Sequence, residues 1–317
     1  MPSKTSFCNG TEFRKCLSRW WPLWVIYGVI LFILLPGVLL NARSTIPYVS
    51  AEQSSYLSNV ILSETQMLLP LTAFCAGLLA AAAMFGYLYT PRGAGLAASL
   101  PIRRGCMFRT HLLAGLLMLL SAEAVIFGLA VLIEATRFEL VIEPLLIWLG
   151  ILALETVVFY GIAVLCAMFT GHVVMLPFLY LLVNFIAVGF QLLVETVLYM
   201  FVYGMSGMVD LPVDWLSPLV LFMRRTSVGH ADLVRPISGT GAEVAIANFS
   251  GWTYPLVWAA FALLLVCAGQ LYRRRRMESA GDTVAIPVLK PVLKYIVALF
   301  AGLAMPVGVY GMLASVV

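Results

Sequence analysis

The sequence predicts an all-α membrane protein that crosses the bilayer with about seven helices. The chain has 317 residues, of which 62% are hydrophobic and 11% are charged, and its mean hydropathy is +1.00. Soluble domains carry roughly 25% charged residues and about 45–50% apolar ones, so a soluble globular protein is excluded. The apolar runs are continuous and do not alternate with polar residues, which favours spanning helices over the strands of a membrane barrel.

Seven apolar segments are long enough to cross the hydrocarbon core of a bilayer, which takes about 20 residues of helix. They are Trp21–Leu40, Thr65–Tyr89, Leu112–Ile133, Pro144–Phe169, Val173–Tyr199, Trp252–Tyr272 and Tyr295–Leu313. Residues 1–317 are therefore expected to form a single transmembrane domain. Tryptophans and tyrosines lie at the ends of several spans, as they do where helices meet the membrane surface.

The basic residues are divided unequally between the two alternate sets of loops. Of the 19 lysines and arginines, 14 fall in the set that includes the amino terminus. Because positive residues gather on the cytoplasmic side of membrane proteins, the amino terminus is predicted to lie in the cytoplasm. The net charge of +4 is then explained by topology and does not indicate a surface that binds nucleic acid.

Three segments on the cytoplasmic side have distinct patterns. Residues 1–20 end with TEFRKCLSRW, whose apolar residues share one helical face. This predicts a short helix lying in the membrane surface, with a frayed tail as the alternative. The loop at 90–111 contains Gly93, Gly95, Pro101 and several arginines. It is either a short docking helix for a cytoplasmic partner or only an anchor for topology. Residues 273–294 form a basic segment.

The segment at 200–251, between the fifth and sixth spans, is predicted to lie outside the cell and to contain helix. Apolar residues alternate there with turn formers. At helical spacing they predict a half-buried stripe that caps the membrane domain. The stripe consists of Trp215, Leu216, Leu219 and Phe222.

Five polar side chains are predicted to lie within the spans, where an ionised carboxylate costs at least about 2.5–3.5 kcal/mol. They are Glu123, Glu155, Asn184, Gln191 and Glu195. Gln191 and Glu195 are four residues apart and share a helix face. Two interpretations stay open. These residues line a transport pathway or a subunit interface, or they are protonated or hydrogen-bonded contacts between helices.

No catalytic, cofactor-binding or metal-binding residue is predicted. None of the four lysines follows the glycine that a P-loop requires, so ATP hydrolysis is expected in a separate subunit. The histidines and cysteines do not occur at the spacing of zinc sites, and no serine hydrolase motif is present. The protein is therefore not expected to be an enzyme.

Five stretches occur together, in an order that resembles a family of bacterial transport proteins. They are FRKCLSRWWPLWVIY at 13–27, SLPIRRGCMFRTHLLAGL at 99–116, MFTGHVVMLPFLYLLVNF at 168–185, LSPLVLF at 216–222 and RRRRMESAG at 273–281. The chain resembles permease subunits of ABC transporters of the second exporter superfamily, which are common in Gram-positive bacteria. The resemblance covers almost the whole chain, and its most specific parts are SLPIRR and ESAG.

The resemblance implies a permease in the bacterial plasma membrane that dimerises with a second permease subunit and binds two cytoplasmic ATPase subunits, which hold the ATP. It implies that the amino-terminal surface helix is a connecting helix that touches the ATPase. It also implies an extracellular cap near Leu216-Ser217-Pro218. The implied contacts with the ATPase in the loop after the second span are Ser99, Leu100, Pro101, Ile102, Arg103 and Arg104.

One feature departs from the family. Such permeases usually have an even number of spans, whereas seven are predicted here. Either the chain is cut short relative to its relatives, or the seventh span, which contains Pro306, does not cross fully. Two other functions stay open, a proton-coupled secondary carrier that uses Glu123 or Glu155, and a membrane anchor or sensor that does not transport.

Overall fold

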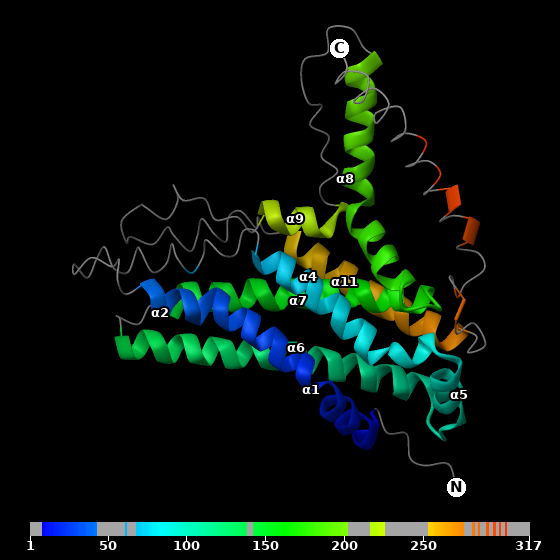
Figure 1. Ribbon diagram of the computed structural model, residues 1–317, viewed down its shortest axis with the longest axis horizontal. Helices are drawn as coiled ribbons and strands as arrows, with labels where there is room; N and C mark the ends of the chain where they lie inside the picture. Colours follow the sequence, from blue (N-terminus) through cyan, green and yellow to red (C-terminus); the bar gives the residue numbers. More distant parts are fainter. Residues whose placement is uncertain are drawn as a thin grey trace.

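The computed structural model describes residues 8–42, 61, 68–137, 142–201, 216–225 and 253–275, with a few isolated positions between 281 and 302. The elements of this part are all helices, so the all-α fold class is confirmed for these residues. They are α1 (Gly10–Phe32), η1 (Ile33–Gly37), α2 (Val38–Ala42), α4 (Leu68–Met84), η2 (Gly86–Tyr89), α5 (Pro91–Ser99), α6 (Arg104–Arg137), α7 (Ile142–Phe169), α8 (Met175–Phe201), α9 (Pro218–Arg225) and α11 (Thr253–Arg274). Figure 1 shows their arrangement.

Four helical stretches are long and apolar enough to cross a membrane, which indicates a membrane protein. They are Gly10–Asn41, Arg104–Thr136, Pro144–Phe169 and Met175–Thr196. These stretches contain or closely match the predicted first, third, fourth and fifth spans. The predicted second span contains α4, an apolar helix of 17 residues, and the sixth coincides with α11. The seventh, 295–313, lies almost wholly outside the described residues.

α1 is divided by a kink at Trp20, whose φ of −107° and ψ of 16° are not helical. Pro22 follows two residues later, and a proline inside a helix removes a backbone donor and crowds the preceding turn. The helix begins at Asn9, whose side-chain oxygen accepts a hydrogen bond from the Thr11 N–H at 3.1 Å. Charged residues lie before the kink and apolar ones after it. The predicted amino-terminal segment is thus helical, and its place in the membrane surface stays a prediction.

α7 is the central helix of the bundle. Every side chain from Leu154 to Val164 is buried, and α4, α6 and α11 pack against this helix. The helices α1 and α6 instead expose large apolar side chains such as Ile26 and Leu132, as helices do when lipid covers them. A helix that is apolar all round, like α7, is stable in this central position because its neighbours cover every face.

α4 and α7 approach so closely that their backbones touch. A Cβ atom placed on Gly77 of α4 would lie 2.8 Å from the Tyr160 backbone nitrogen and 3.0 Å from the Phe159 carbonyl carbon of α7. Small residues permit this approach between membrane helices. Around the contact, the Phe74 and Phe159 rings meet edge to face at 5.7 Å between centroids, and the Tyr180 hydroxyl donates to the Phe74 carbonyl at 3.1 Å.

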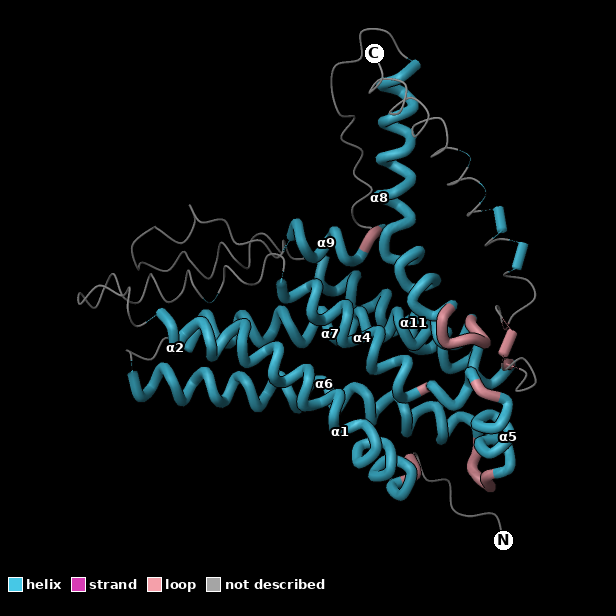
Figure 2. Tube along the Cα trace, viewed as in Figure 1, coloured by secondary structure: helices cyan, strands magenta, loops and turns pink. Residues whose placement is uncertain are grey.

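α8 packs on the bundle through its first half only. Its buried side chains are Leu176, Leu179, Tyr180 and Asn184, and none of the side chains from 185 to 196 is buried. Figures 1 and 2 show that the second half bends away from the other helices. The Ser217 hydroxyl accepts a hydrogen bond from the Val188 N–H at 3.2 Å, and a side chain inserted into the helical ladder is one cause of bending.

α9 confirms part of the stripe predicted between the fifth and sixth spans. Leu219 and Phe222 are each 3% exposed, whereas Leu216 is 47% exposed. The Phe222 ring packs against Phe159 of α7, with 5.6 Å between centroids. Trp215 and most of 200–251 lie outside the described residues, so the cap as a whole and its extracellular position stay predictions.

The close contact between α4 and α7 predicts that Gly77→Ala lowers the free energy of unfolding by about 1–3 kcal/mol, because the added methyl group overlaps backbone atoms that cannot move aside. Thermal unfolding of the protein in detergent measures this. Gly150→Ala in α7 is the control, since its Cβ would meet nothing within 4 Å. Equal stability of the two variants would contradict the close contact.

Candidate functional site

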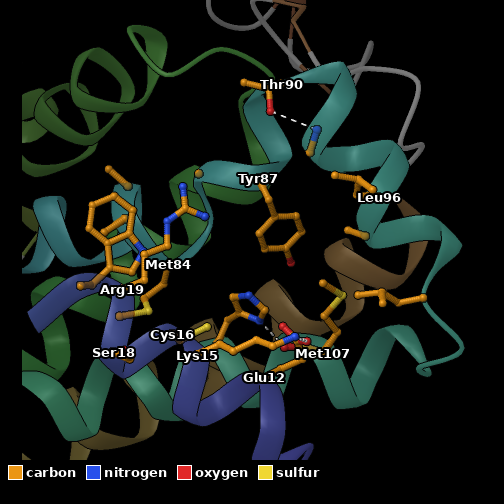
Figure 3. Close-up of a pocket in the computed structure, with 18 of the residues that line it drawn as sticks. Glu12, Lys15, Cys16, Ser18, Arg19, Met84, Tyr87, Thr90, Leu96 and Met107 are labelled. Atoms are coloured by element: carbon orange, nitrogen blue, oxygen red, sulfur yellow. Dashed lines mark hydrogen bonds and ion pairs between the residues drawn. The ribbon is translucent and has the colours of Figure 1, made fainter.

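A pocket of about 850 Å³ lies at one end of the bundle, between the beginning of α1 and α5. Its walls come from α1 between Glu12 and Trp20, from the end of α4 and η2, from α5 as far as Leu100, and from Met107 and His111 of α6. Figure 3 shows side chains from these segments facing a common space. We call it the α1–α5 pocket.

One wall of the pocket is α5, which begins with a well-defined cap. Thr90 accepts a hydrogen bond on its hydroxyl from the Gly93 N–H at 3.2 Å, and Pro91 occupies the first helical position, where no N–H is needed. A Cβ atom on Gly93 would lie 2.8 Å from the Tyr87 carbonyl oxygen, so glycine is required in this turn. The predicted loop at 90–111 therefore contains a short helix.

The opposite wall is charged, and it faces apolar side chains of α5. On α1, Lys15 Nζ donates to Glu12 Oε1 at 2.9 Å, and the Arg19 guanidinium lies 5.5 Å from the centre of the Trp20 ring. Leu96 of α5 is 70% exposed. A hollow with exposed apolar anchors and a charged rim has the character of a surface that binds another protein.

The base of the pocket is built from paired rings. His111 Nδ1 lies 3.0 Å from the Met107 carbonyl oxygen, so it carries the proton in this contact, because a carbonyl can only accept. The Tyr87 ring lies 4.9 Å from the His111 ring between centroids. The Tyr87 hydroxyl donates to the Tyr272 hydroxyl at 3.0 Å. The pocket is thereby fixed to α6 and α11.

Arg275, directly after α11, forms hydrogen bonds with the ends of several helices. Its guanidinium donates to the carbonyl oxygens of Ala167 at 2.8 Å and Met168 at 3.3 Å in α7, and of Leu88 at 3.3 Å in η2. The Arg275 carbonyl accepts from Arg104 Nη1 at 3.3 Å. The last carbonyls of a helix lack partners within it and carry partial negative charge. Burial lowers the pKa of Arg275, yet an arginine remains protonated at neutral pH.

The loop residues with implied ATPase contacts lie next to the α1–α5 pocket. Ser99 and Leu100 line it, while Pro101, Ile102, Arg103 and Arg104 continue to the beginning of α6. The Arg103 carbonyl accepts hydrogen bonds from the N–H groups of Cys106 and Met107 and so starts that helix, and Arg104 contacts Arg275. The fold thus brings this loop beside the amino-terminal helix.

Two of the five predicted intramembrane polar residues meet in the bundle. Glu123 of α6 and Glu155 of α7 are both 0% exposed, and the Glu123 carboxyl group accepts a hydrogen bond from Thr156, the residue that follows Glu155 in α7. Asn184, Gln191 and Glu195 lie on α8. The Asn184 side chain donates to the Tyr180 carbonyl at 2.9 Å, and Gln191 Nε2 donates to Glu195 Oε1 at 2.8 Å, which confirms that Gln191 and Glu195 share a helix face.

Sequence reasoning missed four residues that take part in these arrangements. Tyr27 and Thr156 contact Glu123. Both are polar residues within apolar stretches, so a search of the predicted spans for polar residues could have found them. Glu134 is a further carboxylate with 0% exposure, near the end of the third predicted span. Arg275 could not be singled out, because it is one of four consecutive arginines.

The described parts of the chain contain no group of three or more His, Cys, Asp or Glu side chains that would hold a metal ion. No protein-family model and no curated protein matches this sequence.

The contacts of Arg275 predict that Arg275→Gln lowers the free energy of unfolding by about 1–3 kcal/mol, because buried carbonyls of α7 and η2 lose their donors. Thermal unfolding in detergent measures the loss. Arg274→Gln is the matched control, since the Arg274 side chain is exposed and its removal should change stability by less than about 0.5 kcal/mol. A similar effect of both substitutions would contradict the role of Arg275.

Proposed function

We propose that this protein is the membrane-spanning permease subunit of an ATP-driven ABC transporter in the bacterial plasma membrane, and that it acts as an exporter. A separate ATPase subunit binds and hydrolyses ATP. The permease converts the movement of that subunit into alternating exposure of a pathway, lateral or central, through the membrane. The resemblance of the sequence motifs motivates this proposal, and the geometry of the α1–α5 pocket supports it.

The α1–α5 pocket is the observation that carries the proposal. It joins the two segments to which the resemblance assigns ATPase contacts, the amino-terminal helix and the loop that contains Ser99 and Leu100, although about 80 residues separate them in the chain. The ATPase would place apolar side chains against Leu96 and Leu100 and polar ones against the charged wall of α1. A single partner surface would then contact both segments.

The position of the basic residues supports a cytoplasmic orientation of this pocket. The beginning of α1, α5, the beginning of α6 and the end of α11 gather at one end of the bundle. That end carries most of the arginines and lysines of the described residues, namely Arg14, Lys15, Arg19, Arg92, Arg103, Arg104, Arg109, Arg273, Arg274 and Arg275. A cytoplasmic ATPase could reach the pocket only in this orientation.

A transporter that is driven by an ATPase outside the membrane also requires a rigid connection between the surface that binds the ATPase and the membrane spans. Arg104, at the end of the docking loop, donates to the Arg275 carbonyl, and the Arg275 guanidinium holds carbonyls of α7 and η2. A force that the ATPase exerts on the loop would therefore move the helix ends bonded to Arg275, and would not be lost in bending a flexible connection. This is the role that we assign to the loop braced by Pro101.

A second permease subunit, identical or different, completes the proposed complex. The second half of α8 is the surface that supports this part, because its described side chains are not buried and it carries the Gln191–Glu195 pair. Polar side chains in a membrane are normally turned toward protein or water, and a second subunit packed on α8 would cover them.

A proton-coupled secondary carrier is the second candidate, and the meeting of Glu123 with Glu155 is the observation that favours it. Transport by the purified protein in vesicles, driven by a pH gradient without ATP, would decide for it. An anchor or sensor would show neither ATP-driven nor proton-driven transport. Substrate-stimulated ATP hydrolysis by the permease purified together with an ABC-type ATPase subunit would support the ABC transporter.

The apolar wall of the pocket predicts that Leu100→Asp reduces binding of the ATPase by about tenfold or more, because a carboxylate then has to be desolvated where an apolar contact was. Co-purification of the ATPase with the tagged permease measures this. Ala98→Asp is the matched control, because Ala98 lies two residues before Leu100, is exposed and does not line the pocket. Undiminished binding and transport by Leu100→Asp would remove the docking assignment.

The proposed orientation predicts that Ser99→Cys, in a variant without the six native cysteines, reacts with a membrane-impermeant maleimide only after the cells are opened. Ser99 is exposed, so the new thiol is accessible to a reagent on its own side. Labelling of this residue in intact cells would place the loop outside and contradict the proposed contact with a cytoplasmic ATPase.

A further inference from the structure

A buried polar cluster lies within the membrane domain, away from the α1–α5 pocket. It consists of Tyr27 of α1, Glu123 of α6, and Glu155 and Thr156 of α7. Tyr27 is 4% exposed and the other three residues are 0% exposed. The cluster belongs to three different helices, so it is a product of their packing and not of one sequence motif.

Two hydrogen bonds of the cluster converge on one oxygen, and a third contact joins their two donors. Thr156 Oγ1 donates to Glu123 Oε1 at 2.7 Å, and Tyr27 Oη donates to the same oxygen at 2.9 Å. The two hydroxyl groups lie 3.3 Å apart. Glu123 Oε2 and both carboxyl oxygens of Glu155 have no hydrogen-bond partner among the described residues. Three buried carboxyl oxygens are therefore left without a donor.

No cation of the described residues compensates for these carboxyl groups. The Glu123 carboxyl group accepts hydrogen bonds from the hydroxyl groups of Tyr27 and Thr156, and the Glu155 carboxyl group has no hydrogen-bond partner among the described residues. Tyr27 is the one titratable residue of α1 between Trp21 and Phe32. Arg109, in α6, precedes Glu123 by 14 residues, about 21 Å along the helix, and Glu134 follows it by 11, about 16 Å.

The other helices that pack against α6 and α7 also leave the two carboxyl groups without a basic partner. α4 contains Cys75 as its one titratable residue, and this side chain is exposed. In α11, Cys267 is exposed, Tyr272 is bonded to Tyr87, and the basic residues Arg273 and Arg274 are exposed in the last turn. In α8, Tyr180 is bonded to the Phe74 carbonyl, and Glu195 lies on the half that has no buried side chains.

Two buried carboxylates without a cation cannot both be ionised. Each charge costs several kcal/mol in an apolar surrounding, and neighbouring like charges repel. The two donated hydrogen bonds favour the charged form of Glu123. Glu155 has no donor, so it is the group whose neutral form is favoured.

We propose that Glu123 and Glu155 form a proton-binding site within the membrane domain, in which Glu155 carries the proton and Tyr27 and Thr156 hold Glu123. The step is a proton transfer. A carboxylate oxygen forms an O–H bond with a proton from hydronium and a water molecule is released, without any change of oxidation state. The site goes beyond the proposed ABC transporter, and it would also serve the proton-coupled carrier named as the second candidate. Its tests use neither ATPase nor substrate, so their outcome is independent of both transport roles.

Infrared spectroscopy of the purified protein in detergent tests the site. At neutral pH the protein is expected to show the carbonyl stretching band of a protonated carboxylic acid, which shifts in D₂O and disappears as the pH is raised. Glu155→Gln is expected to lose this band. Asp282→Asn, which removes an exposed carboxylate, is expected to keep it. Absence of the band in the original protein, or an unchanged band in Glu155→Gln, would overturn the proposal.

Tyr27→Phe provides a second test that does not remove either carboxyl group. It deletes one of the two hydrogen bonds to the charged form of Glu123 and leaves Glu155 unchanged. Glu123 should then take up a proton of its own at higher pH. The second carboxylic acid band, which appears on acidification, is expected to have its midpoint about one pH unit or more above that of the original protein. An unchanged midpoint would contradict the proposed arrangement.

The thermal stability of the same samples separates a proton from a metal cation. Glu155→Gln resembles the protonated acid, so its thermal midpoint is expected to fall less than that of the original protein as the pH rises. Stabilisation of the original protein by sodium relative to choline at equal ionic strength, absent in Glu155→Gln, would show that an alkali cation binds and would overturn the proton assignment.

Discussion

The helix bundle is organised around the close contact between α4 and α7. In a bilayer the packing of helices has no hydrophobic driving force of its own, so close van der Waals contact has to supply much of it. Gly77 permits the backbones of the two helices to touch, and this places α7 in the centre of the bundle. Because α7 is then covered by α4, α6 and α11, its polar residues are buried among protein and not among lipid.

The central position of α7 connects the two sites of the protein. Its last carbonyls accept the guanidinium of Arg275, which also contacts η2 and, through its carbonyl, Arg104. Its middle carries Glu155 and Thr156. α1 and α6 likewise contribute to both sites, with Cys16 and His111 at the α1–α5 pocket and Tyr27 and Glu123 in the buried cluster. A rigid displacement of α1 against α6 would therefore change both sites together.

The kink at Trp20 divides α1 between these two sites. The residues before it line the pocket, and Tyr27, after it, donates to Glu123. Trp24, also after the kink, donates from its indole nitrogen to the Ser121 hydroxyl at 3.0 Å, which holds this part of α1 against α6. The two halves of the helix are thus anchored separately. Pro22 lowers the cost of a bend between them, because it removes one backbone hydrogen bond.

Composition and apolar runs were enough to predict an all-helical membrane protein and, to within a few residues, the extents of α7 and α8, because a continuous apolar run of about 20 residues has few other stable forms in water or lipid. They predicted only the apolar part of α6, which begins at Arg104 within the expected loop. The sequence also determined that α1 changes character near Trp20, where charged residues give way to apolar ones. That Tyr27 and Thr156 face Glu123 could be seen only in the packed bundle, because it depends on how three helices are rotated about their axes. The role of Arg275 could not be separated from that of its three arginine neighbours until the helices were packed. Its hydrogen-bond partners are backbone carbonyls. Because every residue carries a backbone carbonyl, no sequence pattern marks the carbonyls that accept a hydrogen bond from this side chain.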